Sequence, residues 1–80
     1  MARGIIVGAH NVSVRRNPWV TESEDVIKEL PNGSTVSVDP ASVVYDWKGH
    51  KYYAYIESGS RVGYVRSSCV RLRERRIRDG

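Results

Sequence analysis

The sequence predicts a small all-β domain in the form of a barrel. Three observations support this: Val, Ile and Tyr are frequent while Leu is rare, turn-forming residues recur at short intervals, and apolar and polar residues alternate over several short segments. β-Branched and aromatic residues favour strands, and clusters of Gly, Pro, Asn, Asp and Ser separate them. Closure into a barrel hides the unpaired backbone groups of short edge strands. We expect five or six short antiparallel strands over residues 4–72, followed by a short Arg-rich C-terminal tail over residues 73–80.

The first part of the chain contains two strand patterns and a loop. Residues 4–9 form a β-branched run, and in residues 12–15 apolar and polar side chains alternate as in a strand with one buried face. Residues 19–25 are polar and acidic without a sustained period, which predicts a long loop. Residues 26–30 then return the chain to the core.

The middle of the chain is divided by turn signals. Asn32-Gly33 predicts a hairpin turn into an alternating strand over residues 35–38. Asp39-Pro40 is expected to end that strand, because proline cannot donate a backbone hydrogen bond. A further short strand is predicted over residues 43–45, followed by a loop over residues 46–50.

The next strand is predicted over residues 51–57, and its alternation places Tyr53 and Tyr55 on one face. The opposite face carries Tyr52, Ala54 and Ile56. Residues 58–60 predict a hairpin turn into a strand over residues 61–65. The domain then finishes with a single turn at Ser67-Ser68 and with Val70 and Leu72.

Four segments resemble motifs of the bacterial Src homology 3 (SH3b) family, in the family's own order. Those motifs are an L-N-V-R-x-x-P strand and turn, an L-P-x-G-x-x-V hairpin, a W-x-x-V strand and a closing G-W-V. The segments here, within residues 5–72, are Val12-Ser13-Val14-Arg15-Arg16-Asn17-Pro18, Leu30-Pro31-Asn32-Gly33-Ser34-Thr35-Val36, Tyr53-Ala54-Tyr55-Ile56 and Gly63-Tyr64-Val65. The chain departs from the family at Ser13, which replaces Asn, at two tyrosines, which replace the tryptophans, and in a longer loop over residues 43–51.

The resemblance implies an SH3-like barrel that recognises peptidoglycan or short peptides. Family members usually accompany cell-wall hydrolases or surface proteins. In the eukaryotic relatives, a proline and a tyrosine near the end of the barrel help to line a polyproline groove, and Arg66 and Cys69 stand at those places here. We therefore do not expect proline-rich peptides to bind in the usual way.

Composition argues against several kinds of site. Cys69 is the only cysteine, so neither an internal disulfide nor a multi-cysteine zinc site is expected. Cys69 as nucleophile with His10 or His50 as base is conceivable, but the residues around Cys69 supply no activating group. We therefore predict that the thiol is inert, that the chain has no catalytic residues and that it is not an enzyme. The two histidines are forty positions apart, and we predict no metal and no cofactor. The longest apolar run, residues 5–7, is too short to span a membrane.

The start of the chain lacks the apolar region and the cleavage site of a secretory signal. If the chain is full length, we therefore expect a cytoplasmic or virion-associated protein. The net charge is +4, and the last ten residues hold +3 of it, with five arginines against Glu74 and Asp79. The body is nearly neutral, so nucleic-acid binding is expected only through the tail.

The candidate ligand groove lies between the loop over residues 19–25 and the loop that follows Val43. Acidic side chains in the first loop suit a basic partner group, although a merely solvated loop has the same composition. Large rings in loops either pack over the barrel or contact a partner. The groove candidates are Trp19, Glu22, Glu24, Asp25, Tyr45, Trp47, Tyr53, Tyr55 and Tyr64.

The arginine-rich tail is the second candidate binding segment. Guanidinium groups bind phosphates or carboxylates in a bidentate manner. The alternative is a tail that is merely solvated and binds no partner. The candidate docking residues are Arg71, Arg73, Arg75, Arg76 and Arg78.

Three functional hypotheses follow. The first is a non-enzymatic SH3b-type binding module whose groove takes a peptide or a peptidoglycan stem or cross-bridge. The second is a structural adaptor of a phage particle or another multi-protein assembly, with the tail docked on a neighbouring protein. The third, nucleic-acid binding, depends on the tail alone.

Overall fold

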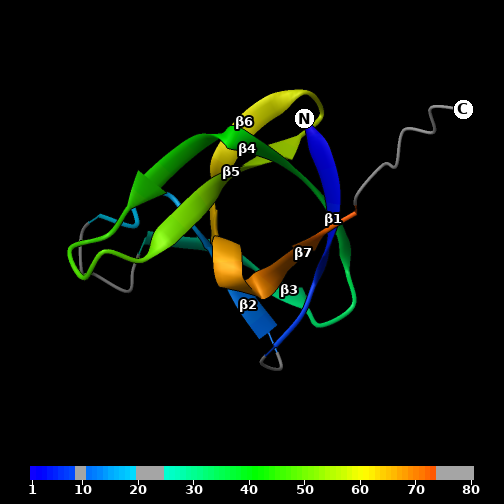
Figure 1. Ribbon diagram of the computed structural model, residues 1–80, viewed down its shortest axis with the longest axis horizontal. Helices are drawn as coiled ribbons and strands as arrows, with labels where there is room; N and C mark the ends of the chain where they lie inside the picture. The colour runs from blue at the N-terminus through cyan, green and yellow to red at the C-terminus, as the bar shows by residue number, and fades with distance from the viewer. Residues whose placement is uncertain (9–10, 20–24, 74–80) are drawn as a thin grey trace, which may run out of the picture.

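The computed structural model describes residues 1–8, 11–19 and 25–73, and these residues form β-strands and turns (Figure 1). The predicted all-β class is confirmed. The strands are β1 (Ala2–Ile6), β2 (Asn11–Arg15), β3 (Val26–Pro31), β4 (Thr35–Tyr45), β5 (Lys51–Glu57), β6 (Ser60–Arg66) and β7 (Val70–Leu72), with one 3-10 turn, η2 (Ser67–Cys69), between the last two. In the described part of the chain, no helix is long and apolar enough to cross a membrane.

The strands form one antiparallel sheet in the order β3-β2-β6-β5-β4-β1-β7. Figure 1 shows the sheet curling so that its strands surround a common centre. The two edge strands, β3 and β7, have no backbone pairing with each other in the described residues, so hydrogen bonds do not close the sheet. The sheet has seven strands instead of the expected five or six. Two segments that were not predicted as strands pair with neighbours: residues 26–31 with β2 and the segment after η2 with β1.

Strand β4 corrects two predictions. Asp39-Pro40 does not end a strand: β4 continues through it for 11 residues, so residues 35–38 and 43–45 belong to one strand. The register with β5 shifts between Asp39 and Val43, which marks a bulge in which Pro40 needs no ladder partner. The Asp39 carboxylate stabilises the bulge by accepting hydrogen bonds from the Ala41 N–H (3.1 Å) and the Ser42 hydroxyl (3.0 Å).

The first strand also differs from its predicted bounds. It covers Ala2–Ile6 rather than residues 4–9, because its ladder partners in β4 reach Ala2, opposite Val38. Val7 and Gly8 follow the strand, and residues 9 and 10 lie outside the described part of the chain.

Both predicted turns are present, but only the second joins a hairpin, because β3 and β4 on either side of the first do not pair with each other. At Asn32-Gly33, Gly33 has a φ of 94° and its N–H donates to the carbonyl of Ile6 (2.7 Å), which fastens the turn to the end of β1. Ser58 and Gly59 both have positive φ, 52° and 79°, as the two central residues of a type I′ hairpin turn require.

The alternation predicted for β5 is confirmed, because its side chains enter two separate apolar clusters. Tyr55 is buried in the main core, and Tyr53 packs against it from a half-buried position. The opposite face supplies Tyr52 and Ala54 to a second, smaller cluster with Tyr64. The buried members of the main core are Ile6, Val12, Val14, Leu30, Val36, Val38, Tyr55, Val65 and Val70.

Candidate functional site

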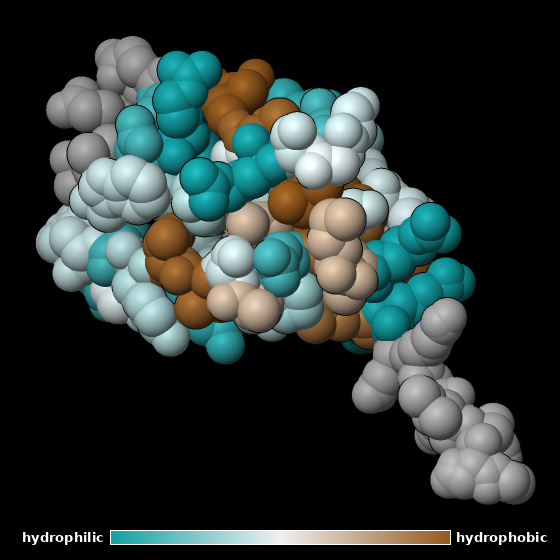
Figure 2. Space-filling view, turned by 90° about the horizontal axis from the view of Figure 1, so that it is seen from above, coloured by the Kyte–Doolittle hydropathy of each residue, from teal (hydrophilic) through white to brown (hydrophobic). Residues whose placement is uncertain are grey.

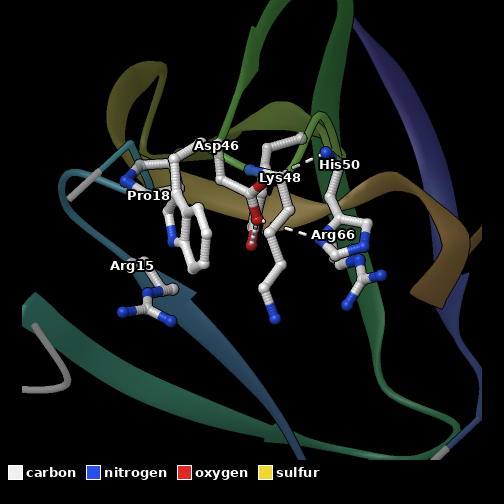
Figure 3. A pocket seen from close by; sticks show the side chains of 8 residues that line it. Arg15, Pro18, Asp46, Lys48, His50 and Arg66 are labelled. Carbon is white, nitrogen blue, oxygen red and sulfur yellow. Dashed lines mark hydrogen bonds and ion pairs between the residues drawn. The ribbon is translucent and has the colours of Figure 1, made fainter. Parts of the chain in front are cut away.

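A pocket of about 290 Å³ opens between the end of β2 and the loop that joins β4 to β5 (Figure 3). One wall comes from β2 and the residues just after it, another from the loop, and the third from β5 and β6. The lining residues are Arg15, Pro18, Asp46, Trp47, Lys48, His50, Tyr52 and Arg66.

Asp46 holds the loop over residues 46–50 in shape. Its Oδ1 accepts hydrogen bonds from the backbone N–H groups of Lys48 and His50, both at 2.9 Å. Its Oδ2 lies 3.0 Å from Nδ1 of His50 and accepts a hydrogen bond from the Tyr52 hydroxyl at 3.1 Å. The chain turns at Gly49, whose φ is 87° and whose N–H donates to the Asp46 carbonyl (2.9 Å). The loop is therefore a preorganised wall of the pocket.

The same contacts set the charge of Asp46. Burial of the side chain opposes ionisation, but the hydrogen bonds from the backbone and the ring of His50, from the Lys48 N–H and from Tyr52 outweigh it, and the pKa of Asp46 lies well below its usual value. The side chain is only 10% exposed. Asp46 is thus an ionised carboxylate whose two oxygens are both occupied by the loop and by Tyr52.

Three strong cations line the pocket, and their charges are compensated unequally. Arg15 Nε lies 3.1 Å from Oδ1 of Asp25, and Oδ2 of the same carboxylate accepts a hydrogen bond from the Asn17 N–H (3.2 Å). Lys48 Nζ lies 5.0 Å from the centre of the Trp47 ring, in cation–π contact. Within the described residues, neither Lys48 nor Arg66 forms an ion pair with a carboxylate. The pocket therefore has a local excess of positive charge.

A second hollow of about 210 Å³ lies beside the first along β2. The two hollows share three lining residues, Arg15, Tyr52 and Arg66, so they lie next to each other across β2, β5 and β6. The second hollow is also lined by the side chains of Asn11, Val12, Ser13 and Cys69. Cys69 is half-buried there and forms no disulfide.

Three aromatic rings predicted for the groove are exposed. Trp47, which lines the pocket, is 66% exposed, and Tyr45 at the end of β4 is 55% exposed. Trp19 is 47% exposed, and its ring packs edge-on against Tyr64 with centroids 5.8 Å apart. Trp19 therefore covers part of the sheet at Tyr64 while leaving about half of its surface to solvent. On the face shown in Figure 2, hydrophobic residues form separate patches divided by hydrophilic ones.

The other predicted groove tyrosines serve packing. Tyr55 is buried in the main core and its hydroxyl donates to Glu57 (3.0 Å). Tyr64 is 9% exposed and lies in the second cluster, and Tyr53 is half-buried below Lys51. None of these three lines the pocket.

Of the remaining predicted residues, the structure describes some and not others. Asp25 lies beside the pocket and pairs with Arg15, whereas Glu22 and Glu24 lie outside the described residues. In the tail segment, Arg71 is exposed in β7 and the Arg73 N–H donates to the carbonyl of Arg3 (2.8 Å). Arg75, Arg76 and Arg78 also lie outside the described part.

Most of the pocket lining was missed by sequence analysis. Of the predicted groove residues that the structure describes, only Trp47 lines the pocket. One local signal was available, because Asp46 followed by Lys48-Gly49 is the pattern of a turn in which an aspartate side chain accepts backbone hydrogen bonds. No local pattern indicated the contribution of Arg15. For Arg66 the available signal was its place in the resemblance, where the eukaryotic relatives have a groove-lining residue.

Within residues 1–8, 11–19 and 25–73, no three His, Cys, Asp or Glu side chains are grouped closely enough to hold a metal ion. Asp46 and His50 are adjacent at 3.0 Å, and their contact holds the loop.

Comparisons of the chain with protein-family models, with curated proteins and with solved structures each found no match.

Proposed function

We propose that the protein is a non-enzymatic binding module that takes a peptide segment, from a protein or from peptidoglycan, in the depression between Pro18-Trp19 and the loop over residues 46–50. One observation carries the proposal: a pocket lies between these two segments, it is lined by Trp47, and Pro18 in its wall is followed by the half-exposed Trp19. Exposed rings at the margin of a preformed pocket are typical of recognition surfaces.

A peptide fits the chemistry of the lining. The second hollow lies beside the pocket along β2, so an extended segment is long enough to contact both. Trp47 and Pro18 offer apolar surface, while Arg15, Lys48 and Arg66 offer hydrogen-bond donors for carbonyl oxygens. We propose binding rather than catalysis because the pocket's carboxylate, Asp46, is committed to holding the loop.

An SH3-like barrel is part of this proposal. The support is the strong curl of the single antiparallel sheet, the 3-10 turn η2 between its last two strands, and the four motif segments that resemble the bacterial Src homology 3 family. In such a barrel the loops after the second and fourth strands of this chain bound one groove, which is where the pocket lies.

The test is co-sedimentation of the purified chain with bacterial sacculi at low and physiological salt, beside NMR titration with soluble muropeptides released from the same sacculi and with a set of protein-derived peptides. We expect saturable binding in at least one arm, with shifts in the backbone signals of residues 46–50. The Trp47→Ala variant should lose this binding. The Val62→Ala variant, which truncates an exposed side chain outside the pocket, should keep it. Absence of saturable binding in every arm, or full binding by Trp47→Ala, would refute the proposal.

A further inference from the structure

We infer that the group recognised in the pocket is a carboxylate of the bound peptide, held between Lys48 and Arg66. The inference rests on the proposed function, since it assigns the ligand's anchoring group in that same pocket. Neither residue was among the groove candidates of the sequence analysis, although the resemblance puts Arg66 at a groove-lining place of the eukaryotic relatives.

The first argument is the balance of charge. Of the three strong cations in the lining, Arg15 is paired with Asp25 at 3.1 Å. The carboxylate in the lining, Asp46, already receives hydrogen bonds on both oxygens from the loop and from Tyr52. The charges of Lys48 and Arg66 are therefore uncompensated by carboxylates within the described residues. An anionic group is the ligand that such a pair attracts most strongly.

The second argument is that both cations are positioned before any ligand arrives. Arg66 lies at the end of β6, directly opposite Tyr52 of β5, and its side chain is half-buried. Lys48 belongs to the loop that Asp46 fixes, and its ammonium group lies over the Trp47 ring. Figure 3 shows the two side chains extending from the pocket wall toward the same open side. Preorganisation of this kind reduces the entropy lost on binding.

The third argument selects a carboxylate over a nucleic-acid backbone. A phosphate backbone is bound by a track of many cations, and each neutralised phosphate adds to a steep salt dependence. The described pocket offers two uncompensated cations beside apolar surface from Trp47 and Pro18, which suits one carboxylate on a peptide. The planar guanidinium of Arg66 can bind both oxygens of such a group, while Lys48 adds a point charge.

The experiment compares matched ligands that differ only in the carboxylate. Stem peptides released from sacculi are titrated by NMR and calorimetry in their native form and after amidation of their carboxylates. Acidic protein-derived peptides are compared in the same way with versions in which Glu and Asp are replaced by Gln and Asn. A single-stranded oligonucleotide is a third probe. The two peptide arms distinguish peptidoglycan from protein as the source of the carboxylate.

The variants are Lys48→Gln and Arg66→Gln, with Arg61→Gln as the matched control. Arg61 lies on β6 like Arg66, is exposed, and contacts Tyr64 outside the pocket. We expect the wild type and Arg61→Gln to bind the free-carboxylate ligand about tenfold more tightly than its neutral counterpart, as a charge-assisted hydrogen bond would give. Each pocket variant should lose most of this preference while retaining the affinity for the neutral ligand. Thermal unfolding of all variants checks that they fold.

The outcomes separate the inference from the proposed function. Equal binding of charged and neutral peptides would overturn the carboxylate inference and leave peptide binding intact. An unchanged preference in both pocket variants would overturn the assignment to Lys48 and Arg66. Binding of neither peptide class would refute the proposed function itself. Binding of the oligonucleotide alone, with a steep salt dependence, would refute both in favour of nucleic-acid recognition.

Discussion

Replacing Gly63 with alanine should destabilise the sheet where β6 lies against β2. A Cβ atom at this position would lie 2.9 Å from Ile27 Cδ1, 2.9 Å from Val14 Cγ1 and 3.0 Å from the carbonyl oxygen of Arg15. Carbon atoms pack best at about 3.5–4.0 Å, so these neighbours would have to move by roughly 0.6 Å or more. The added methyl group therefore creates a steric conflict on two sides at once.

Two of the three neighbours of Gly63 have little freedom to move, whereas Ile27 is 37% exposed and its Cδ1 is the end of a flexible side chain. Val14 is fully buried, and Arg15 pairs with Tyr64 in the ladder between β2 and β6. Overpacking of this kind costs about 1–3 kcal/mol. Gly63 does not have a positive φ, so alanine can adopt its backbone conformation and the stiffer unfolded chain returns about 0.4–1 kcal/mol. The expected net loss is about 1–2 kcal/mol in the free energy of unfolding.

Thermal unfolding followed by circular dichroism measures this loss. For a domain of this size, each kcal/mol lowers the Tm by about 4–8 °C, so we expect a decrease of about 4–16 °C. Ser60→Ala is the control, because Ser60 lies on the same strand but is exposed, and its effect should stay within about 0.5 kcal/mol. A Gly63→Ala variant that unfolds within about 2 °C of the wild type would refute the argument that this glycine is required by close packing of β2 on β6.

Three further predictions concern the loop, the core and the exposed ring. The pKa of Asp46 is lowered in the folded state, so the ionised carboxylate stabilises the fold above the unfolded-state pKa of about 3.9, and this stabilisation is lost as the pH falls below that value. The Tm difference between wild type and Asp46→Asn should therefore shrink between pH 5 and pH 2.5. A constant difference would contradict this. Ile6 is fully buried, so replacing it with Ala should lower the free energy of unfolding in urea by about 2–5 kcal/mol, and replacing it with Val by about 0.5–1.5 kcal/mol. Equal losses would argue against a closely packed site. Trp47→Ala should change stability by less than about 0.5 kcal/mol because the ring is 66% exposed, and a larger loss would show that the ring supports the fold.

Local patterns were reliable wherever one strand or one turn decides the outcome. The alternation in β5 predicted which of its side chains share a face, and Tyr52 and Tyr55 do enter different clusters. The turns at Asn32-Gly33 and Ser58-Gly59 were predicted because glycine tolerates the positive φ that both positions have. Steric limits on the backbone act within a few residues, so the sequence expresses them directly.

Local patterns failed where a neighbouring strand overrides a residue's own preference. Asp39-Pro40 was expected to end a strand, but pairing with β5 on both sides of the bulge keeps β4 continuous. Tyr55 was expected in the groove as one of a set of aromatic rings, and the curl of the sheet instead places its ring in the core. The segment after η2 became a strand because β1 provides a ladder partner.

The sequence by itself determined the all-β class, most of the strands, the face that each β5 side chain occupies, and the loop position of both tryptophans. Only the tertiary structure decided which residues form the pocket. Arg15, Asp46 and Arg66 are far apart along the chain and meet because the register sets Tyr52 opposite Arg66 and Arg15 opposite Tyr64. The charge of the site was decided in the same way: counting residues made the body nearly neutral, whereas hydrogen bonds to Asp46 and the pairing of Arg15 with Asp25 leave Lys48 and Arg66 uncompensated by carboxylates within the described residues. Coulomb energies depend on distance and desolvation, which composition does not contain.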